Sequence, residues 1–188
     1  MDLKKYITKK KPSQYILYTL IIVVGIIFDQ WTKALATEYL SGVSTVPVIE
    51  GFAHLTYHTN PGIAFGMLPG AGWLFNTVTL IVVPLLALYT YLSPINNPVA
   101  EVAIPMIISG GIGNTIDRLS LGYVVDFIDF SRIGFNAIFN VADSFVTVGA
   151  FMLIGVLVFE LIKEIQKERE AKKANNSLQD KTDGEEEK

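Results

Sequence analysis

Apolar residues gather in four long stretches of the chain, each close to the ~20 residues that a helix needs to cross ~30 Å of hydrocarbon. The stretches are residues 15–36, 74–92, 99–118 and 141–162. Pro84 lies inside the second stretch, where a proline favours a kink. The pattern predicts an all-α membrane protein with four transmembrane helices, in a single domain that covers residues 1–162.

The segments between and after these stretches differ in composition. Residues 41–72 contain no Lys or Arg and are rich in Val, Thr and aromatic residues with partial alternation, which predicts a small β-rich region on the membrane surface. Residues 93–98, with the sequence SPINNP, form a short turn without charge. Residues 163–188 are expected to begin as a helical extension and to finish as a charged, disordered tail.

The distribution of basic residues predicts how the chain is oriented. Of the 15 Lys and Arg residues, five lie in residues 1–11 and seven in residues 163–188. Basic residues beside membrane spans favour the cytoplasmic side, so both termini are expected in the cytoplasm and residues 41–72 outside it. Ala34-Leu35-Ala36 resembles a signal-peptide cleavage site, but the charged residues just before it and the further spans argue against cleavage.

With this orientation, the few polar residues of the apolar stretches converge on the external face. Four separate segments contribute: Asp29 with Lys33, Asn114 with Asp117 and Arg118, Asp126, and Asn140 with Asp143. Asp29 and Lys33 are spaced i and i+4, as in a helical ion pair, and are interpreted as mostly architectural. Asp129 and Arg132, in the second external segment, are interpreted as solvated loop charges.

Asp126 and Asp143 are different because each is flanked by apolar residues, in VVDF and FNVADSF. Ionisable residues at membrane depth are functional candidates by default. Two carboxylates ~4 Å apart at an effective dielectric of ~20 repel by about 4 kcal/mol, or roughly three pKa units. One of them would then keep a proton near neutral pH, so the pair could supply the acid and the base that activate water. Asp143, near the start of the fourth span, is the better candidate for the ionised base.

Five short blocks carry a resemblance to a known family. FDQWTK, NPGIAFG, GGIGNTIDR, GYVVDF and FNVADS, in this order, resemble the conserved blocks of bacterial lipoprotein signal peptidase, also called signal peptidase II. The resemblance implies a membrane-embedded aspartic endopeptidase without a cofactor, in the bacterial cytoplasmic (inner) membrane with its active site at the extracytoplasmic face. Its implied partners are prolipoproteins with a diacylglyceryl cysteine, which it cuts before that cysteine, membrane lipid, and globomycin-type inhibitors.

The resemblance also implies roles for particular residues. It makes Asp126 and Asp143 catalytic, and it places Asn114, Arg118 and Asn140 around the dyad and the substrate. Asn60 falls on a loop expected to fold over the substrate, and Asp29 and Lys33 correspond to residues that support the site. Pro61 and Ile63 occupy positions where smaller or polar residues are common in the family, so this loop departs from the family pattern while its Asn, Gly, Ala and Phe remain.

Several other chemistries have little support. The chain has no cysteine, which excludes disulfides and thiolate nucleophiles. His54 and His58 are the only histidines; in a strand they would be about 13 Å apart, so no metal site is expected. Ser120 and Ser144 lack a nucleophile-elbow pattern. The basic clusters are terminal, so nucleic-acid binding has no support.

Two alternatives to a peptidase remain at this level. A small proton- or ion-coupled transporter would also place Asp, Asn and Arg within the membrane. The second alternative is a purely structural membrane subunit. The clustering of polar residues on one face argues against both, because transport requires polar groups that reach both faces.

Overall fold

Four helices and a small antiparallel sheet account for most of the described chain. The computed structural model describes residues 10–61, 72–93, 95–135 and 137–186. The helices are α1 (Pro12–Leu40), α2 (Gly72–Leu92), α3 (Pro98–Ser120) and α4 (Val141–Glu186). Each expected span lies within one of these helices, and α2 continues through Pro84.

The sheet joins the two segments that link the helices at one end of the bundle. Its strands are β1 (Val46–Ile49), β2 (Ala53–Asn60), β3 (Val124–Asp129) and β4 (Ile138–Phe139), in the order β1-β2-β3-β4. All neighbouring strands are antiparallel. The strands expected within residues 41–72 are therefore confirmed, and the second linking segment supplies the two other strands of the same sheet.

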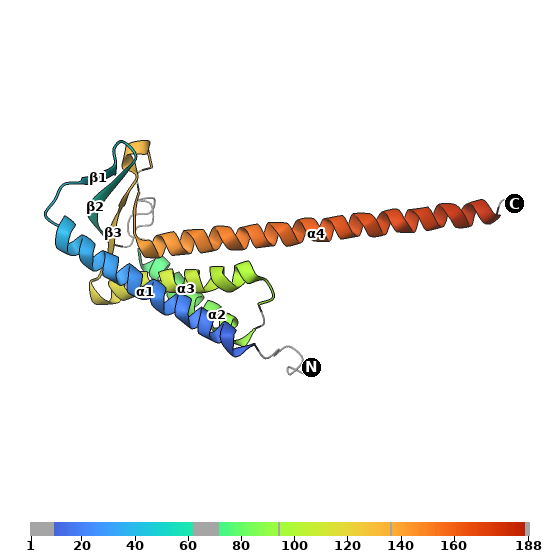
Figure 1. The fold of residues 1–188 in the computed structure, drawn as a ribbon, viewed down its shortest axis with the longest axis horizontal. Helices are drawn as coiled ribbons and strands as arrows, with labels where there is room; N and C mark the ends of the chain where they lie inside the picture. The colour runs from blue at the N-terminus through green and yellow to red at the C-terminus, as the bar shows by residue number, and fades with distance from the viewer. Residues whose placement is uncertain (1–9, 62–71, 94, 136, 187–188) are drawn as a thin grey trace.

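Helix α3 is the centre of the bundle and contacts α1, α2 and α4. Small residues allow its close approach to α4: a Cβ atom added at Gly110 would collide with the carbonyl oxygen of Ala142. The sheet stands at one end of these helices, and α4 runs far beyond them at the other (Figure 1). We call the end of the bundle beside the sheet the sheet end, and the opposite end the far end.

The helix surfaces fit a lipid environment. Among the described residues, three helices are long and apolar enough to cross a membrane, over Pro12–Leu40, Pro98–Ser120 and Val141–Glu170. The apolar stretch described in α2, Thr77–Leu92, is shorter. In the most apolar 18-residue stretch of each helix, 56% of the residues of α3 are buried, against 17% for α1 and 6% for α4. Large apolar side chains such as Phe151, Leu157 and Phe159 are exposed along α4. In water such a surface would be unfavourable, so these faces are suited to lipid.

A polar cluster at the far end joins α1 to α3. Gln14 and Tyr18, on α1, both donate hydrogen bonds to the Glu101 carboxylate at the start of α3. Lys10 donates to the carbonyl oxygen of Thr90, and its ammonium lies 4.7 Å from the centre of the Tyr18 ring. We call these side chains the far-end cluster; they hold the ends of three helices together.

The chain after the fourth span differs from the expectation. Residues 163–188 were expected to finish as a disordered tail, but α4 continues to Glu186. The sequence favours this because Lys, Glu, Gln, Arg and Ala dominate its first half, and because Glu168 and Lys172 are spaced as a favourable i, i+4 pair. A helix already formed by the fourth span also extends without a new nucleation step.

Candidate active site

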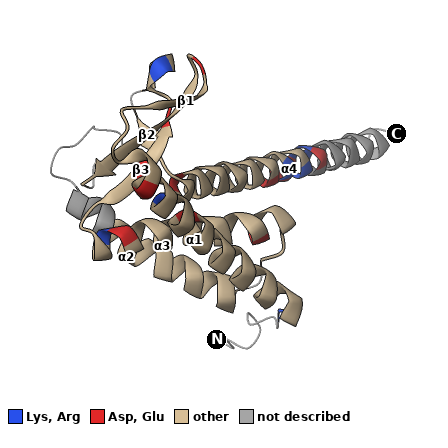
Figure 2. Ribbon diagram, turned by 60° about the vertical axis from the view of Figure 1, so that its left-hand side comes forward, with Lys and Arg blue, Asp and Glu red and all other residues tan. Residues whose placement is uncertain are grey.

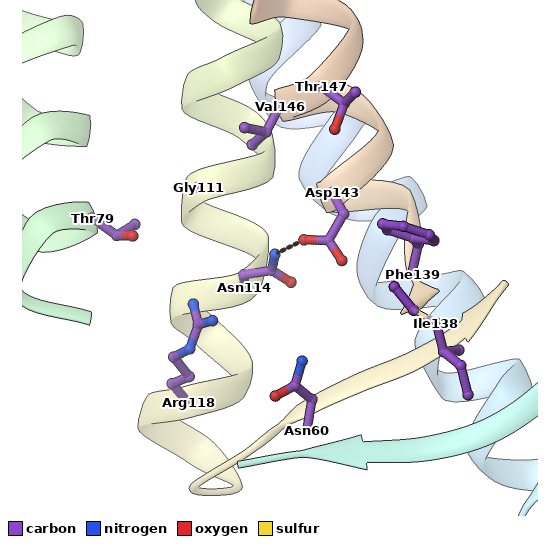
Figure 3. Close-up of a pocket in the computed structure, with 11 residues that line it drawn as sticks. Asn60, Thr79, Gly111, Asn114, Arg118, Ile138, Phe139, Asp143, Val146 and Thr147 are labelled. Carbon is purple, nitrogen blue, oxygen red and sulfur yellow. Dashed lines mark hydrogen bonds between the residues drawn. The ribbon is translucent and has the colours of Figure 1, made fainter. Parts of the chain in front are cut away.

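A pocket of about 280 Å3 opens where the sheet meets α2, α3 and α4 (Figure 3). Its lining combines polar and apolar side chains from five elements and from residue 137. The lining residues are Asn60, Thr79, Gly111, Asn114, Arg118, Ala137, Ile138, Phe139, Asp143, Val146 and Thr147. Three predicted site residues, Asn60, Asn114 and Arg118, therefore share this pocket with Asp143.

Asp143 lies in the first turn of α4, where Asn140 caps the helix. The Asn140 side-chain oxygen accepts a hydrogen bond from the Asp143 backbone N–H at 2.8 Å, and the Asp143 carboxylate accepts one from the Asn140 N–H at 3.3 Å. This reciprocal arrangement is a capping box, and the N-x-x-D spacing in FNVADS was its signal in the sequence. The other Asp143 oxygen accepts a 2.7 Å bond from Asn114.

Asp126 lies on β3 and is 1% exposed. One of its oxygens accepts from the side-chain amide of Asn140 at 2.7 Å, and the other accepts from that of Asn60 at 3.0 Å. Burial, and secondarily repulsion from the Asp143 carboxylate, raise the pKa of Asp126 to about 7. At neutral pH, Asp126 is thus divided between a neutral acid and a carboxylate.

Asn140 connects the two aspartates. It is fully buried, its amide nitrogen contacts Asp126, and its backbone N–H contacts Asp143. The same amide nitrogen also donates to the side-chain oxygen of Asn114 at 3.0 Å. Both carboxylates are therefore one hydrogen bond away from the same residue, although 17 positions separate them in the sequence.

Lys33 contacts the side chain of Asn114. Its ammonium is 2.9 Å from Asp29 and 3.0 Å from Asp117, and it donates a 2.9 Å hydrogen bond to Asn114. The expected i, i+4 pair of Asp29 and Lys33 is confirmed, but it has a third member. Asp117 was noted in the sequence only as a polar residue at a helix end. The available signal was its i+3 spacing from Asn114, which puts both side chains on one face of α3.

Arg118 projects into the pocket from the last turn of α3 (Figure 3). Its Nε atom is buried and has no hydrogen-bond partner among the described residues. A buried donor without a partner is costly, so this atom is suited to an acceptor group of a ligand. Asn60 ends β2 beside it, and residues 62–71, which include Ile63 and the rest of the expected substrate-covering loop, lie outside the described residues.

Asp129 corrects an expectation. It was interpreted as a solvated loop charge, but it is 7% exposed and accepts hydrogen bonds from the Thr56 hydroxyl and the Ser131 N–H, both at 2.8 Å. Burial works against ionisation, yet these hydrogen bonds lower the pKa of Asp129. Asp129 is buried because β3 lies between β2 and β4 in the sheet. The sequence did not reveal that these strands pair. Arg132 is exposed, as expected.

The remaining candidates take structural places. The Ser144 hydroxyl donates to the Asn140 carbonyl oxygen at 3.0 Å, which agrees with its interpretation as a helix-start residue. The Ser120 hydroxyl donates to the carbonyl oxygen of Ile116. His54 and His58 both lie on β2. In the described part of the chain, no group of three His, Cys, Asp or Glu residues could hold a metal ion.

Comparisons with known proteins identify a family for this chain. The model of the family Signal peptidase (SPase) II matches residues 21–159. The lipoprotein signal peptidase of Caldanaerobacter subterraneus is 46% identical over 142 residues, which cover 75% of this chain and 96% of that protein. The enzyme of the same name from Clostridioides difficile is 44% identical over 145 residues, or 77% of this chain and 97% of that protein.

The fold is also similar to that of a solved structure of a bacterial membrane enzyme. The TM-score is 0.69 at 36% sequence identity, and the match covers 77% of this chain and 88% of that one. The matched residues include those of the pocket and both Asp126 and Asp143. On these grounds, the chain belongs to the signal peptidase II family.

Proposed function

We propose that the chain is an aspartic endopeptidase that removes the signal peptide from prolipoproteins, cutting before a cysteine that carries diacylglycerol. The single observation that carries the mechanism is the bridge formed by Asn140, which bonds both Asp126 and Asp143 in a buried position. Membership of a peptidase family argues against the transporter and structural-subunit alternatives.

The two aspartates take complementary roles in this proposal. Asp143 receives hydrogen bonds from Asn114 and from the Asn140 N–H at the start of a helix, all of which favour its ionised form. On the strength of these bonds, Asp143 is assigned as the base that removes a proton from water. Asp126, with a pKa of about 7, donates its proton to the oxygen of the scissile carbonyl. The water oxygen forms the new bond to carbon. The C–N bond then breaks, the proton that Asp143 took from water passes to the leaving amine, and a hydroxyl of the tetrahedral intermediate returns a proton to Asp126.

The pocket offers separate places for the polar and apolar parts of such a substrate. The unpartnered Nε atom of Arg118 lies beside Asp143 in the pocket, and it is suited to a peptide carbonyl oxygen. Ile138, Phe139 and Val146 form the apolar side. Acyl chains or a globomycin-type inhibitor would approach this side laterally from the bilayer.

The proposal includes a particular membrane arrangement. All four helices cross the bacterial cytoplasmic membrane, both termini lie in the cytoplasm, and the sheet end with its active site faces outward. Figure 2 shows charged residues near the sheet, where it meets the helices, and along the outer part of α4, with mostly uncharged helix surface between. The basic residues of 1–11 and 163–188 then lie on the cytoplasmic side, as the positive-inside rule requires.

The test is cleavage of a synthetic prolipoprotein peptide by the purified full-length chain in detergent. The diacylglyceryl form should be cut and the unlipidated form should not. Asp126→Asn and Asp143→Asn should each reduce kcat by ~10³-fold or more, because general acid and base contributions are of that order. Asp129→Asn is the matched control, since Asp129 is a buried aspartate on the same strand that bonds to Thr56. Normal cleavage by either of the first two variants would remove that residue from the mechanism.

A further inference from the structure

Lys33 is bound by three acceptors from two helices. Its ammonium contacts Asp29 on α1 and both Asp117 and Asn114 on α3, at 2.9 to 3.0 Å. Lys33 is 3% exposed, and Asp29 and Asp117 are 1% and 3% exposed. An ammonium has three N–H donors, so this one is fully used. A buried charge is tolerated only when it is paired and hydrogen-bonded, and this condition is met here.

The two carboxylates of this group also hold the main chain at two equivalent points. Asp29 accepts a 2.8 Å hydrogen bond from the backbone N–H of Ala142, the residue directly before Asp143. Asp117 accepts a 3.0 Å bond from the backbone N–H of Val125, the residue directly before Asp126. Each carboxylate partner of Lys33 therefore fixes the backbone N–H of the residue before one member of the dyad.

Gln30 ties the same two carboxylates together a second time. Its amide nitrogen is 2.9 Å from Asp117 and 3.2 Å from Asp29. It also donates to the carbonyl oxygen of Gly113 at 3.2 Å. Gly113 has no room for a side chain, because an added Cβ atom would lie 2.5 Å from an Asp29 oxygen. The helices α1 and α3 are thus in close contact at this point, and the carboxylates have little freedom to move.

We infer that Asp29, Lys33 and Asp117, joined by Gln30, form a positioning cluster that sets the separation and orientation of Asp126 and Asp143. The inference rests on the proposed function and deepens it. These side chains act through the backbone of residues 125 and 142 and through Asn114, and they are not lining residues of the pocket. Charge-assisted hydrogen bonds are shorter and stronger than neutral ones, so two carboxylates are well suited to fix these peptides.

The reason for such a cluster is geometric. The dyad is assembled from a strand and a helix, and Asn140 links the two carboxylates by a single hydrogen bond to each. Catalytic groups must be held within about 0.5 Å of the productive geometry, and a displacement of ~1 Å can cost ~10²-fold in rate. Lys33 binds both Asp29 and Asp117, the two carboxylates that hold the backbone. The positions of Asp126 and Asp143 therefore depend on each other.

The test compares Asp117→Asn with Asp129→Asn in the lipidated-peptide assay, using the full-length chain. Asp117→Asn weakens the bond to Val125 and leaves Lys33 with fewer charged partners. It should lower kcat by about 10- to 100-fold while KM changes by less than about twofold. The control variant should keep both constants within about twofold. An ion pair that serves stability alone predicts normal kcat in the folded fraction, and that result would overturn the inference.

Two further variants keep the test decisive. Gln30→Leu removes only the amide between the carboxylates, and it should lower kcat by about threefold to tenfold even if Asp117→Asn fails to fold. In the Asp29→Asn and Asp117→Asn double variant, the loss of kcat should be smaller than the product of the single losses, because both act on one dyad. Multiplicative losses, or normal kcat in Gln30→Leu, would contradict a shared role. If the unsubstituted chain does not cut the lipidated peptide, the proposed function fails instead.

Discussion

Two polar clusters occupy opposite ends of the same pair of helices, and they differ in how completely their charges are matched. At the far end, one acidic group, Glu101, receives hydrogen bonds from Gln14 and Tyr18, and one basic group, Lys10, lies over the Tyr18 ring. At the sheet end, Lys33 lies between Asp29 and Asp117. Asp126 and Asp143 add two more carboxyl groups close by.

This difference in charge matching shows that the unbalanced charge of the fold lies at the sheet end. The far-end cluster contains matched groups, and it closes contacts between helix ends. The sheet end holds four carboxyl groups, Asp29, Asp117, Asp126 and Asp143, against the cations of Lys33 and Arg118. Burial of Asp126, and secondarily repulsion from Asp143, raise the pKa of Asp126 to about 7. Such an arrangement is unfavourable for stability alone, and perturbed pKa values of this kind gather at functional sites.

The largest difference in stability between the two ends is expected from removing their ammonium groups. Lys33→Met leaves Asp29 and Asp117 buried without a counter-charge, so it should reduce the free energy of unfolding by about 3–5 kcal/mol. Lys10→Met at the far end should cost only about 1 kcal/mol, because the hydrogen bond to Thr90 is the main loss. Denaturant-induced unfolding in mixed micelles measures both. Equal losses would contradict the proposed difference between the clusters.

Activity should respond to pH through the sheet end. Asp126 must be protonated to act as the acid, and its pKa is about 7. The rate constant kcat/KM should therefore be lost above neutral pH, approaching about tenfold per pH unit. Because the folded pKa exceeds the unfolded one, this carboxyl also stabilises the fold at acidic pH, and that contribution is lost as pH rises from ~4 towards ~7. A flat profile between pH 6 and 9 would exclude Asp126 as the acid.

Arg118 is expected to affect binding more than chemistry. Arg118→Met removes the unpartnered donor of the pocket while retaining an apolar stem. Losing one charge-assisted hydrogen bond of about 1.5 kcal/mol should raise KM by roughly tenfold. The matched control is Arg132→Met, since Arg132 is exposed on the short helix after β3. Steady-state kinetics with the lipidated peptide separate KM from kcat.

The smallest effect is expected at the acidic residue of the far end. Glu101→Gln keeps an acceptor for Gln14 and Tyr18, so it should cost less than about 1 kcal/mol of stability. Its kcat and its pH profile should match those of the unsubstituted chain. A large loss of activity in this variant would show that the two ends are coupled through α1 and α3, and it would contradict their independence.

The candidate site was predictable where its signals were local. Asp126 and Asp143 stand out because each interrupts an apolar run, and Asn60, Asn114, Arg118 and Asn140 were placed at the site by resemblance. Asp117 was not assigned a role, and Asp129 was assigned the wrong surroundings. In both cases the decisive contact comes from another element: Lys33 for Asp117, and Thr56 on β2 for Asp129.

Apolar length, alternation and i, i+4 spacing are properties of neighbouring residues, so they were enough to predict the helices, the β-rich region and the pairing of Asp29 with Lys33. The hydrogen bonds between different elements became evident only in the folded molecule. Asp29 and Ala142, 113 positions apart, meet only because α1 packs beside the start of α4. Contacts of this kind depend on the packing of whole elements, so no local pattern encodes them.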